Sequence, residues 1–65
     1  MKLLLNNQEV ESSAKTLAEL LSERDIETKG IAVALNRRVI ARTAWAEQPI
    51  SEGDSVVMVS AVYGG

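Results

Sequence analysis

The residues that can do chemistry are the last ones, where an apolar run over residues 55–62 leads through Tyr63 into Gly64 and Gly65. Glycine has no side chain, so it adds nothing to a core and loses much backbone entropy on ordering. Two glycines can, however, thread a narrow enzyme channel and present the carboxylate of Gly65 there. A carboxylate is a poor electrophile until another enzyme adenylates it with ATP, after which a sulfur, amine or thiol nucleophile can take the acyl group. The tail therefore predicts covalent attachment at Gly65, with Tyr63 and Gly64 as threading residues.

The rest of the composition removes the usual catalytic groups. The chain of 65 residues has no histidine and no cysteine, so the commonest general base, thiolate nucleophile and metal ligands are missing. Glu9 and Glu11 alternate along an expected strand, and Glu23, Asp25 and Glu27 fit a solvated helix end. We predict no catalytic residue, no metal site and no bound cofactor.

Charge and hydropathy limit the possible classes of partner and the cellular location. The net charge of -2, from seven basic and nine acidic residues, does not fit a nucleic-acid-binding protein. No apolar run reaches the length of a membrane span, and a strand that begins at Lys2 leaves no room for a signal peptide. We expect one cytoplasmic domain over residues 1–65 that binds neither nucleic acid nor membrane.

Short strands and one helix are expected to carry the tail. Asn6-Asn7 and Asn36-Arg37-Arg38 are turn signals between apolar runs, which is typical of hairpins. Thr16 and Glu19 form a capping-box pattern, in which Thr16 accepts from the Glu19 N–H and Glu19 reaches back. Strands are predicted at residues 2–5, 8–12, 31–35, 39–41 and from 55 onward, with a helix over about 17–24 and a helical turn at 43–47 that carries Trp45.

This order predicts an α+β fold, with a mixed sheet of about four to five strands and one main helix on one face. A hairpin followed by a helix that crosses the sheet is the β-grasp, or ubiquitin-like, arrangement. The first and last strands are expected to lie side by side in the middle of the sheet.

Alternation along the strands assigns two faces to the sheet. The core side should hold Met1, Leu3, Leu5, Leu17, Leu20, Leu21, Val33, Leu35, Val56 and Met58. A sheet with one wet face is normally polar on that face, yet the side chains assigned to it are apolar. They are Leu4, Ala32, Ala34, Val57, Val59 and Ala61. An exposed apolar patch often marks a partner surface, so we expect partner binding there, although scattered surface valines and alanines are common.

Over essentially its whole length the chain resembles the ThiS family, the sulfur carrier proteins of thiamine thiazole synthesis. The resemblance is carried by Met1-Lys2-Leu3 with Asn6, Thr16-Leu17, Leu20-Leu21, 32–36, Arg42, Trp45, and Gly53-Asp54 through Ala61-Val62 to Gly64-Gly65. It differs at Arg37, where glycine often follows the asparagine, at Ala41, where proline often precedes the arginine, and at Tyr63, where a small residue is common.

The resemblance implies a protein co-substrate rather than an enzyme. A ThiF-type enzyme would adenylate Gly65, a sulfur donor such as a cysteine desulfurase would supply a persulfide, and the product would be a thiocarboxylate, 1-thioglycine, at Gly65. The sulfur would pass to a ThiG-type thiazole synthase.

Other functions stay open at the level of sequence. A MoaD-like subunit of molybdopterin synthase shares the fold, tail and activation step, although such chains tend to be longer before the last strand. A non-covalent β-grasp interaction module would not depend on Gly65. A small enzyme would show turnover by itself, which the missing histidine and cysteine disfavour.

Overall fold

β5 (Ser55–Ser60) lies at the centre of a five-stranded sheet whose strands run in the order β2-β1-β5-β3-β4. The computed structural model describes residues 1–60. The other elements are β1 (Lys2–Leu5), β2 (Gln8–Glu11), α1 (Leu17–Glu23), β3 (Ile31–Leu35), β4 (Arg38–Ile40) and the 3₁₀ helix η1 (Arg42–Glu47). β5 runs parallel to β1 and antiparallel to β3, so the predicted mixed sheet and its central pair of strands are confirmed.

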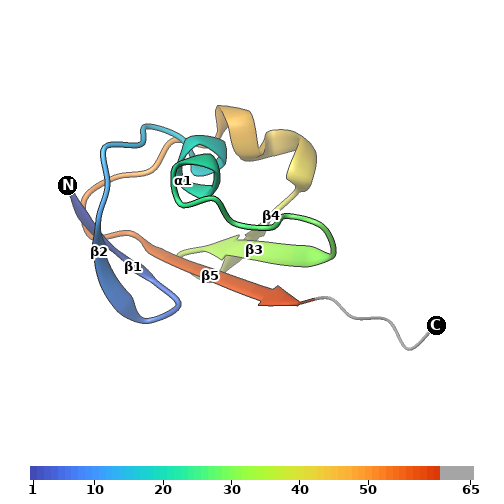
Figure 1. The fold of residues 1–65 in the computed structure, drawn as a ribbon, viewed down its shortest axis with the longest axis horizontal. Coiled ribbons are helices and arrows are strands. Elements are labelled where there is room, and N and C mark those ends of the chain that lie inside the picture. The colour runs from blue at the N-terminus through green and yellow to red at the C-terminus, as the bar shows by residue number, and fades with distance from the viewer. Residues whose placement is uncertain (61–65) are drawn as a thin grey trace.

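The sheet has one covered face and one uncovered face (Figure 1). α1 and η1 both lie on the same side of the sheet, and no other helix in residues 1–60 covers the opposite side. This matches the predicted arrangement of one main helix on one face. In the described part of the chain, no helix has the length and apolar character needed to span a bilayer.

Both hairpins turn through two residues in the left-handed region. φ is 49° at Asn6 and 67° at Asn7 in the first hairpin, and 51° at Asn36 and 71° at Arg37 in the second. Two successive residues with positive φ give the turn whose twist matches the flanking strands. Asparagine adopts this region more readily than most residues. This explains why asparagine occupies both positions of the first turn and the first position of the second turn.

α1 begins with the predicted cap, but only half of the predicted box forms. The Thr16 hydroxyl accepts from the Glu19 N–H at 3.2 Å. The Glu19 carboxylate, however, accepts from the Lys15 N–H at 3.0 Å. Glu19 therefore reaches one residue further back than the predicted box requires, and Thr16 also forms an isolated antiparallel bridge with Pro49. The helix ends at Glu23, with Arg24 as its C-cap.

The predicted core side is confirmed. Leu3, Leu17, Leu20, Leu21, Val33, Leu35 and Val56 are buried, and Met1, Leu5 and Met58 pack against them. Four further core residues, Ala14, Ile40, Trp45 and Ile50, lie in segments without a strand or helix period strong enough to assign their faces.

η1 closes the open end of the core with Trp45. The indole N–H donates to the Ile40 carbonyl at 2.9 Å, so the ring is buried without an unpaired donor. The Arg42 guanidinium stacks over the ring at 4.9 Å from its centroid and also donates to the Thr28 carbonyl. Arg42 thereby ties the loop after α1 to η1.

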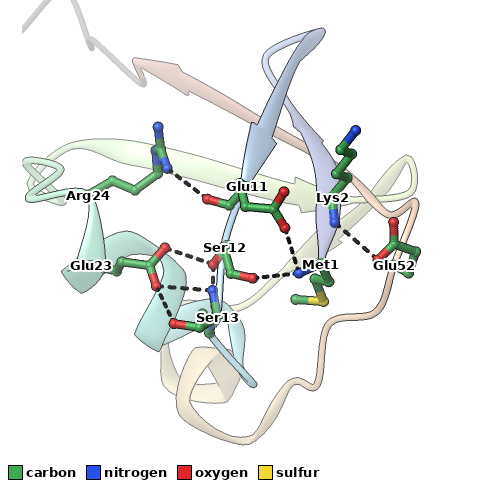
Figure 2. Close-up of polar contacts among 9 residues, drawn as sticks. Met1, Lys2, Glu11, Ser12, Ser13, Glu23, Arg24 and Glu52 are labelled. Atoms are coloured by element: carbon green, nitrogen blue, oxygen red, sulfur yellow. Dashed lines mark hydrogen bonds and ion pairs between the residues drawn. The ribbon is translucent and has the colours of Figure 1, made fainter.

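A polar cluster joins the end of β2 to the end of α1 (Figure 2). Glu23 accepts from the Ser12 hydroxyl at 2.7 Å and from the Ser13 hydroxyl at 3.3 Å. The Ser12 hydrogen bond is the main reason that the pKa of Glu23 lies below its usual value. Beside it, the Met1 ammonium pairs with Glu11 at 2.8 Å, and their hydrogen bond raises the pKa of the ammonium and lowers that of Glu11. Glu23 is exposed, as predicted for a helix end. Hydrogen bonds from Ser12 and Ser13 nevertheless hold its carboxylate in place.

Candidate functional site

β5 presents different environments on alternate residues. Val56 is fully buried beneath α1, whereas Val57 and Val59 are 36% and 55% exposed on the opposite side of the sheet. The strand leads directly toward Tyr63, Gly64 and Gly65, which lie outside the described residues, as does Ala61. The covalent chemistry predicted for Gly65 is thus attached to the most central strand of the sheet.

The side chains assigned to the second face adjoin one another across three strands. Ala32 pairs with Val59 and Ala34 pairs with Val57, and Leu4 pairs with Ser55 on the other flank of β5. Leu4 is 38% exposed, and the two alanines are half-buried. We call the apolar surface formed by Leu4, Ala32, Ala34, Val39, Val57 and Val59 the uncovered face.

Val39 is the member of the uncovered face that the sequence analysis missed. It pairs with Ala34, so it points to the same side, and it is 73% exposed. The predicted strand at 39–41 began one residue later than β4, whose Arg38–Ile40 span places Ile40 in the core. Alternation from a buried Ile40 would have assigned Val39 outward.

Charged residues of both signs border the uncovered face on the β2 side. Glu9 pairs with Leu4 and Glu11 pairs with Lys2, so both carboxylates lie on the same side as Leu4. Glu11 is partly neutralised by the Met1 ammonium, whereas no ion pair to Glu9 is present in residues 1–60. Lys2 lies on the same side, opposite Glu11, so the Lys2 and Met1 ammonium groups balance the two carboxylates at this edge.

The beginning of β5 is fixed by a network around Asp54. The Asp54 carboxylate accepts from the Ser51 N–H at 2.6 Å and from the Asn36 amide at 3.1 Å. The Asn36 side-chain oxygen accepts from the Ser55 N–H at 2.9 Å. Gly53, with φ at 85°, supplies a backbone conformation that a side chain would disfavour. The turn therefore joins the β3–β4 hairpin to the first residue of β5.

Two positions that differ from the ThiS pattern are compatible with the observed backbone. Ala41 has φ at −61°, which is the value that proline would hold. Arg37 has φ at 71°, where glycine would be unstrained. Both substitutions leave the family geometry intact, at a cost in strain only for Arg37. The third difference, Tyr63, lies outside the described residues.

No group of three or more carboxylates within residues 1–60 is placed to hold a metal ion, and no buried side-chain polar atom there lacks a hydrogen-bond partner. What this geometry offers is a surface for docking and a strand that carries the chain end.

Comparison with known proteins identifies the family. The model of the ThiS family matches residues 2–65. The chain belongs to the ThiS family. The sulfur carrier protein ThiS of Escherichia coli is 32% identical over the full length of both chains, and that of Thermus thermophilus is 36% identical over 94% of this chain and 95% of its own. This ThiS-family chain is accordingly a sulfur carrier, a co-substrate rather than an enzyme, and a role in thiamine biosynthesis fits.

A solved structure and a longer relative complete the comparison. The crystal structure of the thiamine biosynthesis protein ThiS from Geobacter metallireducens matches all of both chains with a TM-score of 0.89 at 26% identity, which confirms the β-grasp fold. A thiazole synthase of Paramagnetospirillum magneticum is 30% identical to the whole of this ThiS-family chain over only 20% of its own length. In that protein a ThiS-like segment is part of the same polypeptide as the synthase.

Proposed function

We propose that this chain carries sulfur as a thiocarboxylate on Gly65 and delivers it to a thiazole synthase. A ThiF-type enzyme adenylates the Gly65 carboxylate with ATP and releases pyrophosphate. Sulfur from a persulfide, formed by a donor such as a cysteine desulfurase, then displaces AMP, and cleavage of the sulfur–sulfur bond by a thiol leaves 1-thioglycine. The chain itself binds no cofactor, and residues 1–65 act as one cytoplasmic carrier domain.

The observation that carries this proposal is the position of β5. The same strand exposes Val57 and Val59 on the uncovered face and continues toward Tyr63, Gly64 and Gly65. A partner that docks on the uncovered face would therefore meet the tail from a fixed direction.

The presence of a ThiS-like segment in a thiazole synthase supports that enzyme as the acceptor. Joining two proteins in one polypeptide raises their effective concentration for each other, which is useful when one must pass a labile group to the other.

Intact-mass measurement tests the covalent step. The full chain, incubated with ATP, magnesium, a ThiF-type enzyme and a persulfide source, should gain the mass difference of one oxygen-to-sulfur exchange, located in the C-terminal peptide. Omission of ATP is the control and should leave the mass unchanged. Failure to gain sulfur with a cognate activating enzyme would reject the proposal.

A charge placed on the uncovered face tests docking. Val59→Asp should leave the fold largely intact, because Val59 is 55% exposed, but should weaken binding to the activating enzyme or the synthase. Glu47→Asp, an exposed change on η1 away from this face, is the matched control. Global unfolding of Val59→Asp would show that the faces of β5 are assigned wrongly.

A further inference from the structure

The two flanks of β5 receive unequal support toward the carboxyl end. β3 pairs with β5 from Leu35 opposite Val56 to Ile31 opposite Ser60. β1 pairs with it only at Ser55 and Val56, because β1 then turns away into β2. The last residues of β5 therefore have a neighbouring strand on the β3 flank alone.

Asn6 replaces the missing neighbour on the β1 flank. Its backbone N–H donates to the Val56 carbonyl at 2.8 Å, and its side-chain oxygen accepts from the Met58 N–H, also at 2.8 Å. In a continuing parallel ladder, that N–H would bond to the main-chain carbonyl of residue 6. Because Asn6 has φ at 49° and begins the turn, its side chain supplies the oxygen instead.

Asn36 makes the equivalent contact at the other end of the strand. It has nearly the same backbone conformation, with φ at 51°, and its side-chain oxygen accepts from the Ser55 N–H. Each hairpin therefore contributes one asparagine that holds one backbone N–H of β5. The Asn6 contact, at Met58, is the nearer of the two to the end of β5 from which the chain continues toward Gly65.

We propose that Asn6 is a positioning residue for sulfur transfer, which fixes the direction in which the chain leaves β5. The inference rests on the proposed function. Holding Met58 against Asn6 keeps the end of β5 in the plane of the sheet beside the uncovered face, so a docked partner meets the tail in one orientation. Without that contact the strand end is held on one flank only, and the partner must order it on binding, which weakens association.

Asn6→Gly is the decisive variant, because glycine keeps the left-handed turn and removes the acceptor. Amide exchange at Met58 should become at least about fivefold faster, the factor expected for one lost hydrogen bond. In the adenylation assay, the KM for the full-length carrier should rise about fivefold with kcat unchanged, because the lost contact acts on binding rather than on the reacting carboxylate.

Three matched variants separate positioning from simple loss of stability. Asn6→Asp retains an acceptor oxygen and a tolerance for positive φ, so it should restore both values. Asn7→Gly changes the adjacent turn residue, for which residues 1–60 show no side-chain hydrogen bond, and should behave as wild type. Asn36→Gly loosens the start of β5 and should lower overall stability while leaving the KM near the wild-type value.

The outcomes are distinguishable from failure of the proposed function. A wild-type chain that never gains sulfur overturns both the function and this inference. An active wild-type chain together with an unchanged KM for Asn6→Gly overturns the inference alone, and so does an equal rise in KM for Asn36→Gly. Exchange at the core amide of Val33, buried beneath α1, reports whether Asn6→Gly has remained folded.

Discussion

Arg37 holds the second position of the β3–β4 turn with φ at 71°, a conformation that costs a residue with a Cβ roughly 1 kcal/mol or more. The side chain is exposed, and no hydrogen bond or ion pair within residues 1–60 holds it. The strain is therefore not offset by a contact.

Arg37→Gly is expected to stabilise the chain by about 0.5–1 kcal/mol. Relief of the left-handed strain exceeds the additional entropy that glycine gives the unfolded chain. Arg38→Gly is the matched control, because residue 38 begins β4 and glycine weakens a strand. Urea unfolding of the three chains checks both signs, and a destabilised Arg37→Gly would reveal that the arginine side chain contributes.

Glu23 gives the stability a pH dependence whose sign follows from its hydrogen bonds. Its folded-state pKa is lowered from 4.5, first by the Ser12 hydroxyl, so its contribution is complete above that value. The contribution is lost as the pH falls below about 4.5 and through the folded-state pKa, because protonation then occurs in both states.

Glu23→Gln should therefore be less stable than wild type at pH 7 and should approach wild-type stability as the pH falls through the lowered folded-state pKa of Glu23. Thermal unfolding between pH 3 and 7 measures the difference. Glu47→Gln, whose side chain makes no hydrogen bond in the described part of the chain, should show no such convergence. A constant difference across the pH range would mean that the Ser12 contact does not form.

At the scale of elements, β5 shows how one strand can serve two purposes through simple alternation. Val56 is fully buried against α1, and its neighbour Val57 is 36% exposed on the uncovered face. The same residue type at successive positions thus belongs to the core or to the candidate docking surface.

Alanine at these two positions should give unequal losses of stability. Val56→Ala removes two buried methyl groups and should cost about 2 kcal/mol. Val57→Ala should change stability by less than about 1 kcal/mol, while reducing the apolar area offered to a partner. Denaturation midpoints check the first effect, and equal losses at both positions would contradict the assignment of the faces.

The elements themselves could be predicted from the sequence because their signals are local. Both turns were predicted from the pairs Asn6-Asn7 and Asn36-Arg37, and the start of α1 was predicted from Thr16 and Glu19. Glu19 accepts from the Lys15 N–H, one residue before the donor of the predicted box. The burial of Trp45 depends on the packing of η1 against the core, and no apolar spacing in the sequence predicted it.

Strand alternation predicted one part of the candidate site, whereas another part depends on a contact between residues far apart in the sequence. Leu4, Val57 and Val59 were assigned outward by strand period, and their exposure agrees. Val39 was missed because no face was assigned to the predicted strand at 39–41, in which a buried Ile40 places Val39 outward. The bond between Asn6 and Met58 joins residues 52 apart in sequence, and no local pattern predicts an acceptor at that distance. Partner binding by these residues remains a prediction.

At the scale of the whole molecule, folding and reactivity depend on different parts of the chain. Every buried core residue of the described structure lies between Leu3 and Val56, whereas the proposed chemistry is at Gly65. Stability and transfer should therefore respond to different changes.

Deletion of Gly64 and Gly65 should leave the unfolding midpoint within a few degrees of that of the full chain. It should abolish the gain of sulfur, because the acyl group would no longer reach the activating site. Calorimetry and intact-mass analysis of the same sample measure the two properties. Sulfur gain by the shortened chain would remove the basis for assigning attachment to Gly65.

The placement of β5 between β1 and β3 also affects the order of assembly during synthesis. A growing polypeptide that has not yet reached residue 55 holds two hairpins and a helix, but it lacks the strand that joins them. Since the β1–β5 pairing links residues about 50 positions apart, the sheet closes late and comparatively slowly. A chain interrupted before β5 could not complete the sheet and would lack the uncovered face. Activating enzymes that recognise this face would therefore not bind incomplete chains.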